Sequence, residues 1–168
     1  MSNGITNIYK TGATADEIII DEAADGYRLP TLEQWQYAAR GGLSSLRFPW
    51  SDNISHEMSN YKSDPEQFDY DSNIGTGSPF YHPDYIYPSS EAPPYTCEVN
   101  HLAPNGYGLY HIVGNVSEWC WDPVTGSGRY VAGGSYASDP SECRIMATNT
   151  FTASSAADYI GFRTVLKR

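Results

Sequence analysis

The chain has 168 residues, of which 40% are hydrophobic and 14% aromatic, enough for one domain with a real core and too many for a disordered chain. Its formal net charge is −10 with only ten Lys and Arg residues, which excludes the basic face that a nucleic-acid-binding protein needs. The sequence contains neither an apolar run of about 18 residues nor a visible signal peptide, so it predicts no membrane-spanning segment. We therefore expect a single domain over residues 1–168.

The first quarter of the chain carries the clearest local signals. Residues 1–26 form a lead-in, with a short strand predicted at the apolar run of residues 17–21. Residues 27–42, YRLPTLEQWQYAARGG, predict a helix with Thr31 as its N-cap and the glycine pair as its end. The residues at helical spacing, which predict one apolar face, are Leu32, Trp35, Ala38 and Ala39.

The middle of the chain predicts ordered but irregular structure. Residues 43–105 are polar and rich in Asp, Ser, Pro and Tyr, yet too aromatic for a linker. In the following segment EWCWD, alternation places Trp119 and Trp121 on one face of a strand, where we expect core packing, with Trp121 as a pocket floor in the alternative. Further short strands are predicted in 129–138, where the two glycines indicate a bulge, and in 143–146 and 161–168.

The residues that commonly carry chemistry are spread apart. The three cysteines, Cys97, Cys120 and Cys143, show no CxxC spacing, so we expect buried small hydrophobic residues. The four histidines have no metal-ligand spacing, and no GxSxG, P-loop or GxGxxG motif occurs. The residues themselves therefore indicate no catalytic site.

Several motifs occur in a fixed order: YRLPTLEQWQYAARGG, FPW, NGYGLYHIVGNVSEWCWD, GGSY, CR and GFR, from Tyr27 to Arg163. This ordered set resembles the family of formylglycine-generating enzymes and sulfatase-modifying factors. The resemblance implies an α+β, C-type lectin-like fold, rich in loops, with short antiparallel strands, few helices and neighbouring termini. It also implies a cell-surface or secreted location.

The same resemblance bears on catalysis. The enzymes of this family are understood to bind copper through two cysteines and to oxidise a substrate cysteine to formylglycine. Cys143 stands at the place of the second cysteine, but Ser138 stands at the place of the first, and a hydroxyl is a poor ligand for Cu(I). We therefore predict a structural Cys143 and no enzyme, with a formylglycine-generating oxidase acting on sulfatase cysteines, or a structural accessory domain, as the alternatives.

The resemblance implies no required cofactor but structural calcium in the loops. One site would use Gly114, Val116 and Glu118. A second would use the backbone of Asn60 and Tyr61 with a downstream carboxylate, either Asp69 or Asp71. In the alternative, Glu118 and Asn115 hold the loop by hydrogen bonds alone.

The tract ATNTFTASSAADY, residues 147–159, shows neither helical nor strand periodicity and lies between CR and GFR. NNY codons can encode all of its residues, and in this it resembles the variable proteins of diversity-generating retroelements. That resemblance implies a diversified surface within residues 129–168 that binds a protein or another macromolecule; an ordinary surface loop is the alternative. The predicted exposed contact residues are Tyr136, Ala137, Ser138, Asp139, Ala147, Asn149, Thr150, Phe151, Thr152, Ala157, Asp158 and Tyr159.

Overall fold

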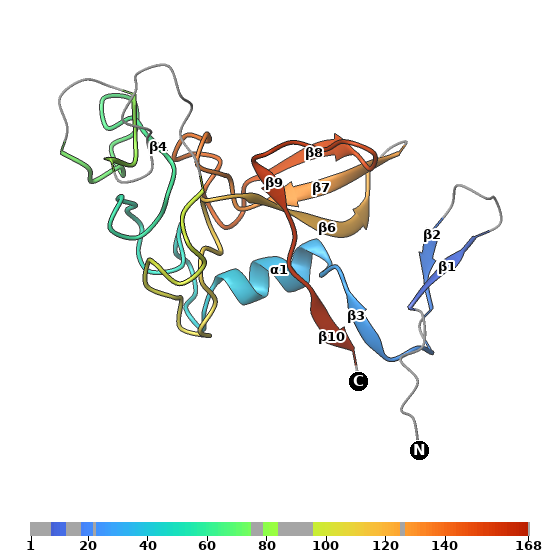
Figure 1. The fold of residues 1–168 in the computed structure, drawn as a ribbon. Helices are drawn as coiled ribbons and strands as arrows, with labels where there is room; N and C mark the ends of the chain where they lie inside the picture. Colours follow the sequence, from blue (N-terminus) through green and yellow to red (C-terminus); the bar gives the residue numbers. More distant parts are fainter. Residues whose placement is uncertain are drawn as a thin grey trace.

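A four-stranded sheet lies against a single helix at the centre of the part of the chain that the structure, a computed structural model, describes (Figure 1). The described residues are 8–12, 18–21, 23–74, 79–83, 96–124 and 127–167. The strand order is β8-β7-β6-β9, with β6–β7 and β7–β8 antiparallel and β9 parallel to β6. These elements are α1 (Leu32–Ala39), β6 (Ser117–Pro123), β7 (Gly128–Ala132), β8 (Thr148–Thr152) and β9 (Ile160–Gly161).

Helix α1 confirms the predicted start and end. Thr31 accepts a hydrogen bond from the backbone of Gln34 at 3.2 Å, and the Gln34 side chain accepts one from the Thr31 backbone at 3.0 Å, which completes a capping box. Gly41 and Gly42 follow the helix with φ of 57° and 90°, conformations that favour glycine. Trp35, only 1% exposed, anchors the helix in the core.

The core joins α1, one face of the sheet and apolar side chains of the irregular segments. Because side chains alternate along β6, Glu118 and Cys120 point toward the helix, and Ala132 of β7 joins them. Trp119 and Trp121 share the opposite face and are half-buried. The predicted common face of the two tryptophans is thus confirmed, but their predicted place in the core is wrong, because the helix covers the face with the smaller side chains.

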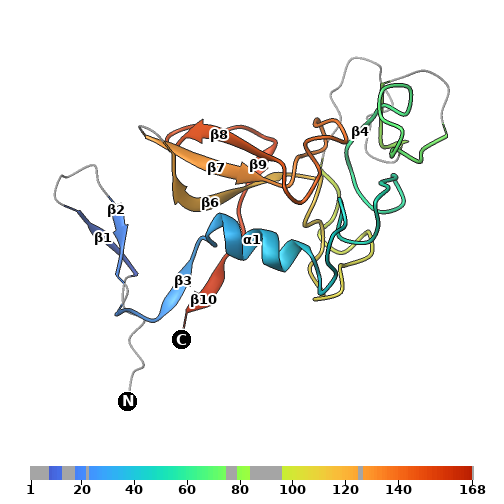
Figure 2. The same ribbon diagram turned by 180° about the vertical axis from the view of Figure 1, so that it is seen from behind.

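Three short antiparallel ribbons complete the fold (Figure 2). Strand β3 (Gly26–Arg28) pairs with β10 (Val165–Lys167), so segments near the two ends of the chain lie side by side. Strand β2 (Ile18–Ile20), which confirms the apolar strand predicted in the lead-in, pairs with β1 (Tyr9–Thr11), and β4 (Lys62–Ser63) pairs with β5 (Phe80–Tyr81). The α+β, loop-rich architecture with few helices agrees with the predicted fold class.

Buried polar contacts hold the described part of the loop-rich middle, and residues 75–78 and 84–95 of the segment predicted to be irregular lie outside the described residues. The Asp71 carboxylate accepts hydrogen bonds from the Tyr61 hydroxyl at 2.6 Å and the Ser63 hydroxyl at 2.7 Å. His56 packs on the Tyr61 ring with centroids 4.9 Å apart. Such contacts replace regular secondary structure in satisfying buried polar groups. Among the described residues, no helix has the length and apolar character needed to cross a bilayer.

Three sequence-based expectations for the C-terminal region are wrong. Residues 143–146 form turns rather than a strand, and the Ile145 backbone donates instead to the Arg47 carbonyl at 2.9 Å. The tract at 147–159 contains β8, which pairs with β7 along its whole length. The two glycines also form no bulge, because they follow the end of β7. The register shift in the pairing of β6 with β7 lies within β6.

Candidate functional site

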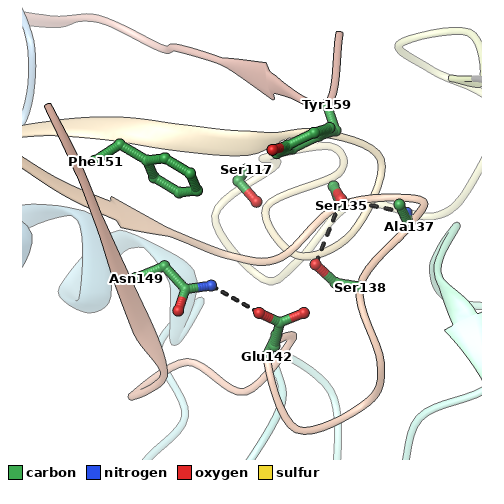
Figure 3. Close-up of a pocket in the computed structure, with 8 residues that line it drawn as sticks. All are labelled: Ser117, Ser135, Ala137, Ser138, Glu142, Asn149, Phe151 and Tyr159. Atoms are coloured by element: carbon green, nitrogen blue, oxygen red, sulfur yellow. Dashed lines mark hydrogen bonds between the residues drawn. The ribbon is translucent and has the colours of Figure 1, made fainter. Parts of the chain in front are cut away.

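A cleft of about 240 Å³ opens on the face of the four-stranded sheet that points away from α1 (Figure 3). Its side chains come from β6, from β8, from the loop after β7 and from the segment that leads into β9. The lining residues are Ser117, Ser135, Ala137, Ser138, Glu142, Asn149, Phe151 and Tyr159.

The loop after β7 is shaped by the glycine pair of the GGSY motif. Gly133 and Gly134 have φ of 94° and 66°. A Cβ at Gly134 would lie 2.8 Å from Cys143 Sγ, so only glycine lets this loop approach Cys143. The next turn is tied by the Ser135 hydroxyl, which accepts from the Ala137 backbone at 3.2 Å and lies 3.4 Å from the Ser138 hydroxyl.

A second turn carries Glu142, the one carboxylate among the described residues that line the cleft. The Asp139 carboxylate accepts from the backbone and the hydroxyl of Ser141 at 2.8 and 2.6 Å, and so holds the turn rather than the cleft. Glu142 follows, and its Oε1 accepts a hydrogen bond of 2.7 Å from Asn149 on β8. The turn and the edge strand are therefore joined across the cleft.

The structure brings together part of the predicted contact set. Ala137, Ser138, Asn149, Phe151 and Tyr159 line the cleft. The sequence reasoning missed three further lining residues, which are Ser117, Ser135 and Glu142. All three lie in or beside a motif of the sequence, since Ser117 belongs to NGYGLYHIVGNVSEWCWD, Ser135 belongs to GGSY and Glu142 directly precedes the CR motif.

The remaining predicted residues lie elsewhere. Thr150 and Thr152 alternate with the cleft-lining residues and point to the other face of β8. Trp121 lies in a separate cleft of about 230 Å³, where the Arg129 guanidinium stands 5.1 Å from the centre of its ring. The other residues outside the cleft lining are Tyr136, Asp139, Ala147, Ala157 and Asp158.

Two residues expected to be exposed are buried. Tyr136 is 6% exposed and Ser138 is 8% exposed, because the loop after β7 folds back over the core. Burial, with the neighbouring Asp158 as a further cause, raises the pKa of the Tyr136 hydroxyl. Ser138 still lines the cleft, whereas Tyr136 does not.

The three cysteines are buried, which confirms the prediction that they serve as small buried residues, and Cys120 and Cys143 belong to the core. Cys143 is fully buried against Gly134, and burial strongly raises the pKa of its thiol. Burial also raises the pKa of Cys120, to about 12. Thiols with such raised pKa values are poor metal ligands, since the thiolate is the form that binds.

The carboxylates proposed for calcium are engaged by the protein itself. Glu118 accepts from Trp35 Nε1 at 2.7 Å and forms an ion pair with Arg163. Both oxygens of Asp71 accept hydrogen bonds from side chains and backbone, and Asp69 is exposed.

In this arrangement Glu118 and Asp71 make their hydrogen bonds and their ion pair within the protein. Within the described residues, no group of three or more His, Cys, Asp or Glu side chains is placed to hold a metal ion. The hydrogen-bonding alternative describes the loop: Asn115 Oδ1 accepts from the Cys97 backbone at 2.8 Å, and the Asn115 backbone donates to Asn60 at 2.7 Å. Calcium binding stays a prediction.

Comparison with known proteins shows which family and which proteins the sequence resembles. Residues 3–168 match the family described as "Sulfatase-modifying factor enzyme 1-like domain". A formylglycine-generating enzyme of Thermomonospora curvata is 34% identical over 165 residues, covering 82% of this chain and 48% of the enzyme. The inactive C-alpha-formylglycine-generating enzyme 2 of Mus musculus is 31% identical over 152 residues, covering 82% of this chain and 42% of that protein.

A solved structure is similar over nearly the whole chain. Treponema denticola variable protein 1 superimposes with a TM-score of 0.62 and 28% sequence identity, over 92% of this chain and 52% of the other. The chain thus spans about half the length of the relatives that it matches.

Proposed function

Because the chain belongs to the family of sulfatase-modifying factor enzyme 1-like domains, we propose that it is a non-catalytic member that binds a protein or another macromolecule at the cleft and the surface around it. The observation that carries this proposal is the lining of the cleft. It holds hydroxyls, an amide, a carboxylate and two aromatic rings, and no cysteine among the described residues. In the enzymes that the chain resembles, one of the two copper-binding cysteines is understood to stand at the place of Ser138, and a hydroxyl is a poor ligand for Cu(I).

The tract at 147–159 supports a diversified surface of the kind found in variable proteins of diversity-generating retroelements. It supplies β8 and the segment before β9, and its Asn149, Phe151 and Tyr159 line the cleft. Aromatic side chains offer rigid contact area, and Ser, Thr and Asn offer adaptable hydrogen bonds, as in antibody paratopes. The similarity to Treponema denticola variable protein 1 adds to this reading.

Sequencing the gene and its surroundings tests whether the tract at 147–159 is diversified. We expect a near-identical template repeat and a reverse transcriptase gene close to the coding sequence. Independent isolates should differ within codons 147–159 and agree in the flanking CR and GFR motifs. Identical tracts in all isolates, without a template repeat, would remove the diversified surface from the proposal.

An oxidase is the second candidate, and the 34% identity to a formylglycine-generating enzyme favours it. The test is to incubate the protein with copper, oxygen and a sulfatase-type cysteine peptide, and to follow the peptide by mass spectrometry. We expect no formylglycine, with an active enzyme of the family as the positive control. Conversion of the peptide would establish the oxidase and overturn the non-catalytic proposal.

A further inference from the structure

We propose that the cleft receives the guanidinium group of an arginine side chain from a protein partner. This inference rests on the proposed binding function and specifies the chemistry that the cleft selects. It follows from the charge of the cleft, from the rings that border it and from its size.

The charge of the cleft favours a cation. Glu142 is the one charged side chain among the described lining residues, and neither Lys nor Arg accompanies it. Its Oε1 accepts from Asn149, while Oε2 has no hydrogen-bond partner among the described residues and stands on the side toward Ser138 (Figure 3). A phosphate, sulfate or carboxylate would meet an uncompensated negative charge here, whereas a cation would form a charge-assisted hydrogen bond.

Two aromatic rings border the same opening. Phe151 and Tyr159 lie on separate sides of the cleft, across from Glu142 (Figure 3). Phe151 also contacts Trp119, edge to face, with ring centroids 6.3 Å apart. A guanidinium is planar and stacks on aromatic faces while it keeps its in-plane N–H donors, so arginine suits this pair better than lysine.

The remaining lining matches the donors of such a group. The hydroxyl oxygens of Ser117 and Ser138 stand between the rings and Glu142 and can accept N–H bonds (Figure 3), while the buried Ser135 hydroxyl already accepts from the Ala137 backbone. The volume of about 240 Å³ lies below the roughly 300–1,000 Å³ that is typical of small-molecule sites. It is suited to one inserted side chain, and buried arginine anchors are frequent in protein interfaces.

Titration of the ¹⁵N-labelled protein with small probes tests the charge selection. The probes are Nα-acetyl-arginine amide and its neutral isostere Nα-acetyl-citrulline amide, followed by amide chemical shifts. We expect shifts at Ser138 and Asn149, with arginine binding about tenfold more tightly than citrulline, because one charged hydrogen bond separates the two probes. Glu142→Gln should abolish this preference, whereas the exposed control Glu66→Gln should keep it. Equal binding of both probes to the unaltered protein would overturn the proposal.

Selection of random linear peptides separates this inference from the proposed function. Cleft-dependent peptides are those that bind the unaltered protein and lose binding when Ala137→Trp fills the opening. Enrichment of arginine among them supports the proposal. Cleft-dependent peptides without arginine enrichment, or a neutral disaccharide that shifts the same amides independently of Glu142, would overturn it and leave a binding function in place. The absence of any cleft-dependent peptide would overturn the arginine proposal, whereas the proposed function is tested separately by the sequences of the locus.

Discussion

At the residue scale, the Glu118 carboxylate connects the helix, the sheet and the last part of the chain. It accepts from Trp35 on α1 at 2.7 Å and from Arg163 Nη2 at 2.7 Å, and it is buried. Removal of the cation would leave a buried charge, so we expect Arg163→Met to lower the free energy of unfolding by about 3 kcal/mol or more. Urea denaturation measures it, with Arg144→Met, on the surface, as the control. Equal stability of the two variants would contradict the assigned role of the ion pair.

His56 predicts a loss of stability in acid. Burial, with the nearby His82 as a lesser cause, lowers its pKa from 6.5 to about 4, although its contact with the Tyr61 carbonyl and the charge of Asp71 act in the opposite direction. Between pH 6.5 and 4 the unfolded chain binds a proton that the folded protein does not. The free energy of unfolding from this group therefore falls with falling pH, by up to about 1.4 kcal/mol per pH unit.

Urea denaturation at pH 7 and pH 5 checks this dependence. His56→Gln should flatten the difference between the two pH values, and the exposed His101→Gln should leave it nearly unchanged. Burial also lowers the pKa of His111, so part of the dependence should survive in His56→Gln. An unchanged pH dependence in His56→Gln would assign the effect to other groups.

At the scale of elements, α1 depends on its first turn. The helix has only eight residues, and Thr31 satisfies an N–H that would otherwise lack an intrahelical partner. We expect Thr31→Ala to lower the free energy of unfolding by about 1 kcal/mol and Thr31→Ser to have little effect. Thermal and urea unfolding of the three proteins measure this. A serine variant as unstable as the alanine variant would point to the lost methyl group instead of the cap.

The elements also show how far sequence reasoning reaches. Helix α1 was predictable because its cap, its spacing and its glycine end all agree within sixteen residues. Strand β8 was not, because it is an edge strand in which Phe151 is the one apolar residue, and its pairing partner β7 lies about twenty residues earlier. Alternation placed the two tryptophans on one face but could not say which face the helix covers.

The cleft was predictable only in part, because several of its residues come together through contacts between segments that are far apart in the sequence. Asn149, Phe151 and Tyr159 come from the tract that the sequence singled out. Ser117 and Glu142 join them only through the register of β6 and the turn after the glycine pair, and both depend on contacts between distant segments. Local patterns do not contain that information.

At the scale of the whole molecule, the sheet separates stability from binding. One face packs Cys120 and Ala132 into the core around α1, while the other carries the cleft. The tract at 147–159 contributes the edge strand and the segment into β9, and its side chains are exposed or half-buried. Substitutions in the tract therefore change the cleft and its edge without opening the core.

Because of this separation, we expect the protein to tolerate substitutions at the exposed positions of the tract but not at buried positions of the core. A library randomised at the exposed Thr148, Thr150, Thr152 and Asp158, with proline excluded, should remain mostly folded, because surface changes usually shift stability by within about 0.5 kcal/mol. A matched library at four buried positions, Val113, Ala132, Cys143 and Ile145, should be mostly unfolded, because cavities and overpacking cost several times more. Surface display with a protease challenge counts the folded fraction of each library. Similar losses in both would mean that the tract supports the fold itself, and the diversified-surface proposal would lose its physical basis.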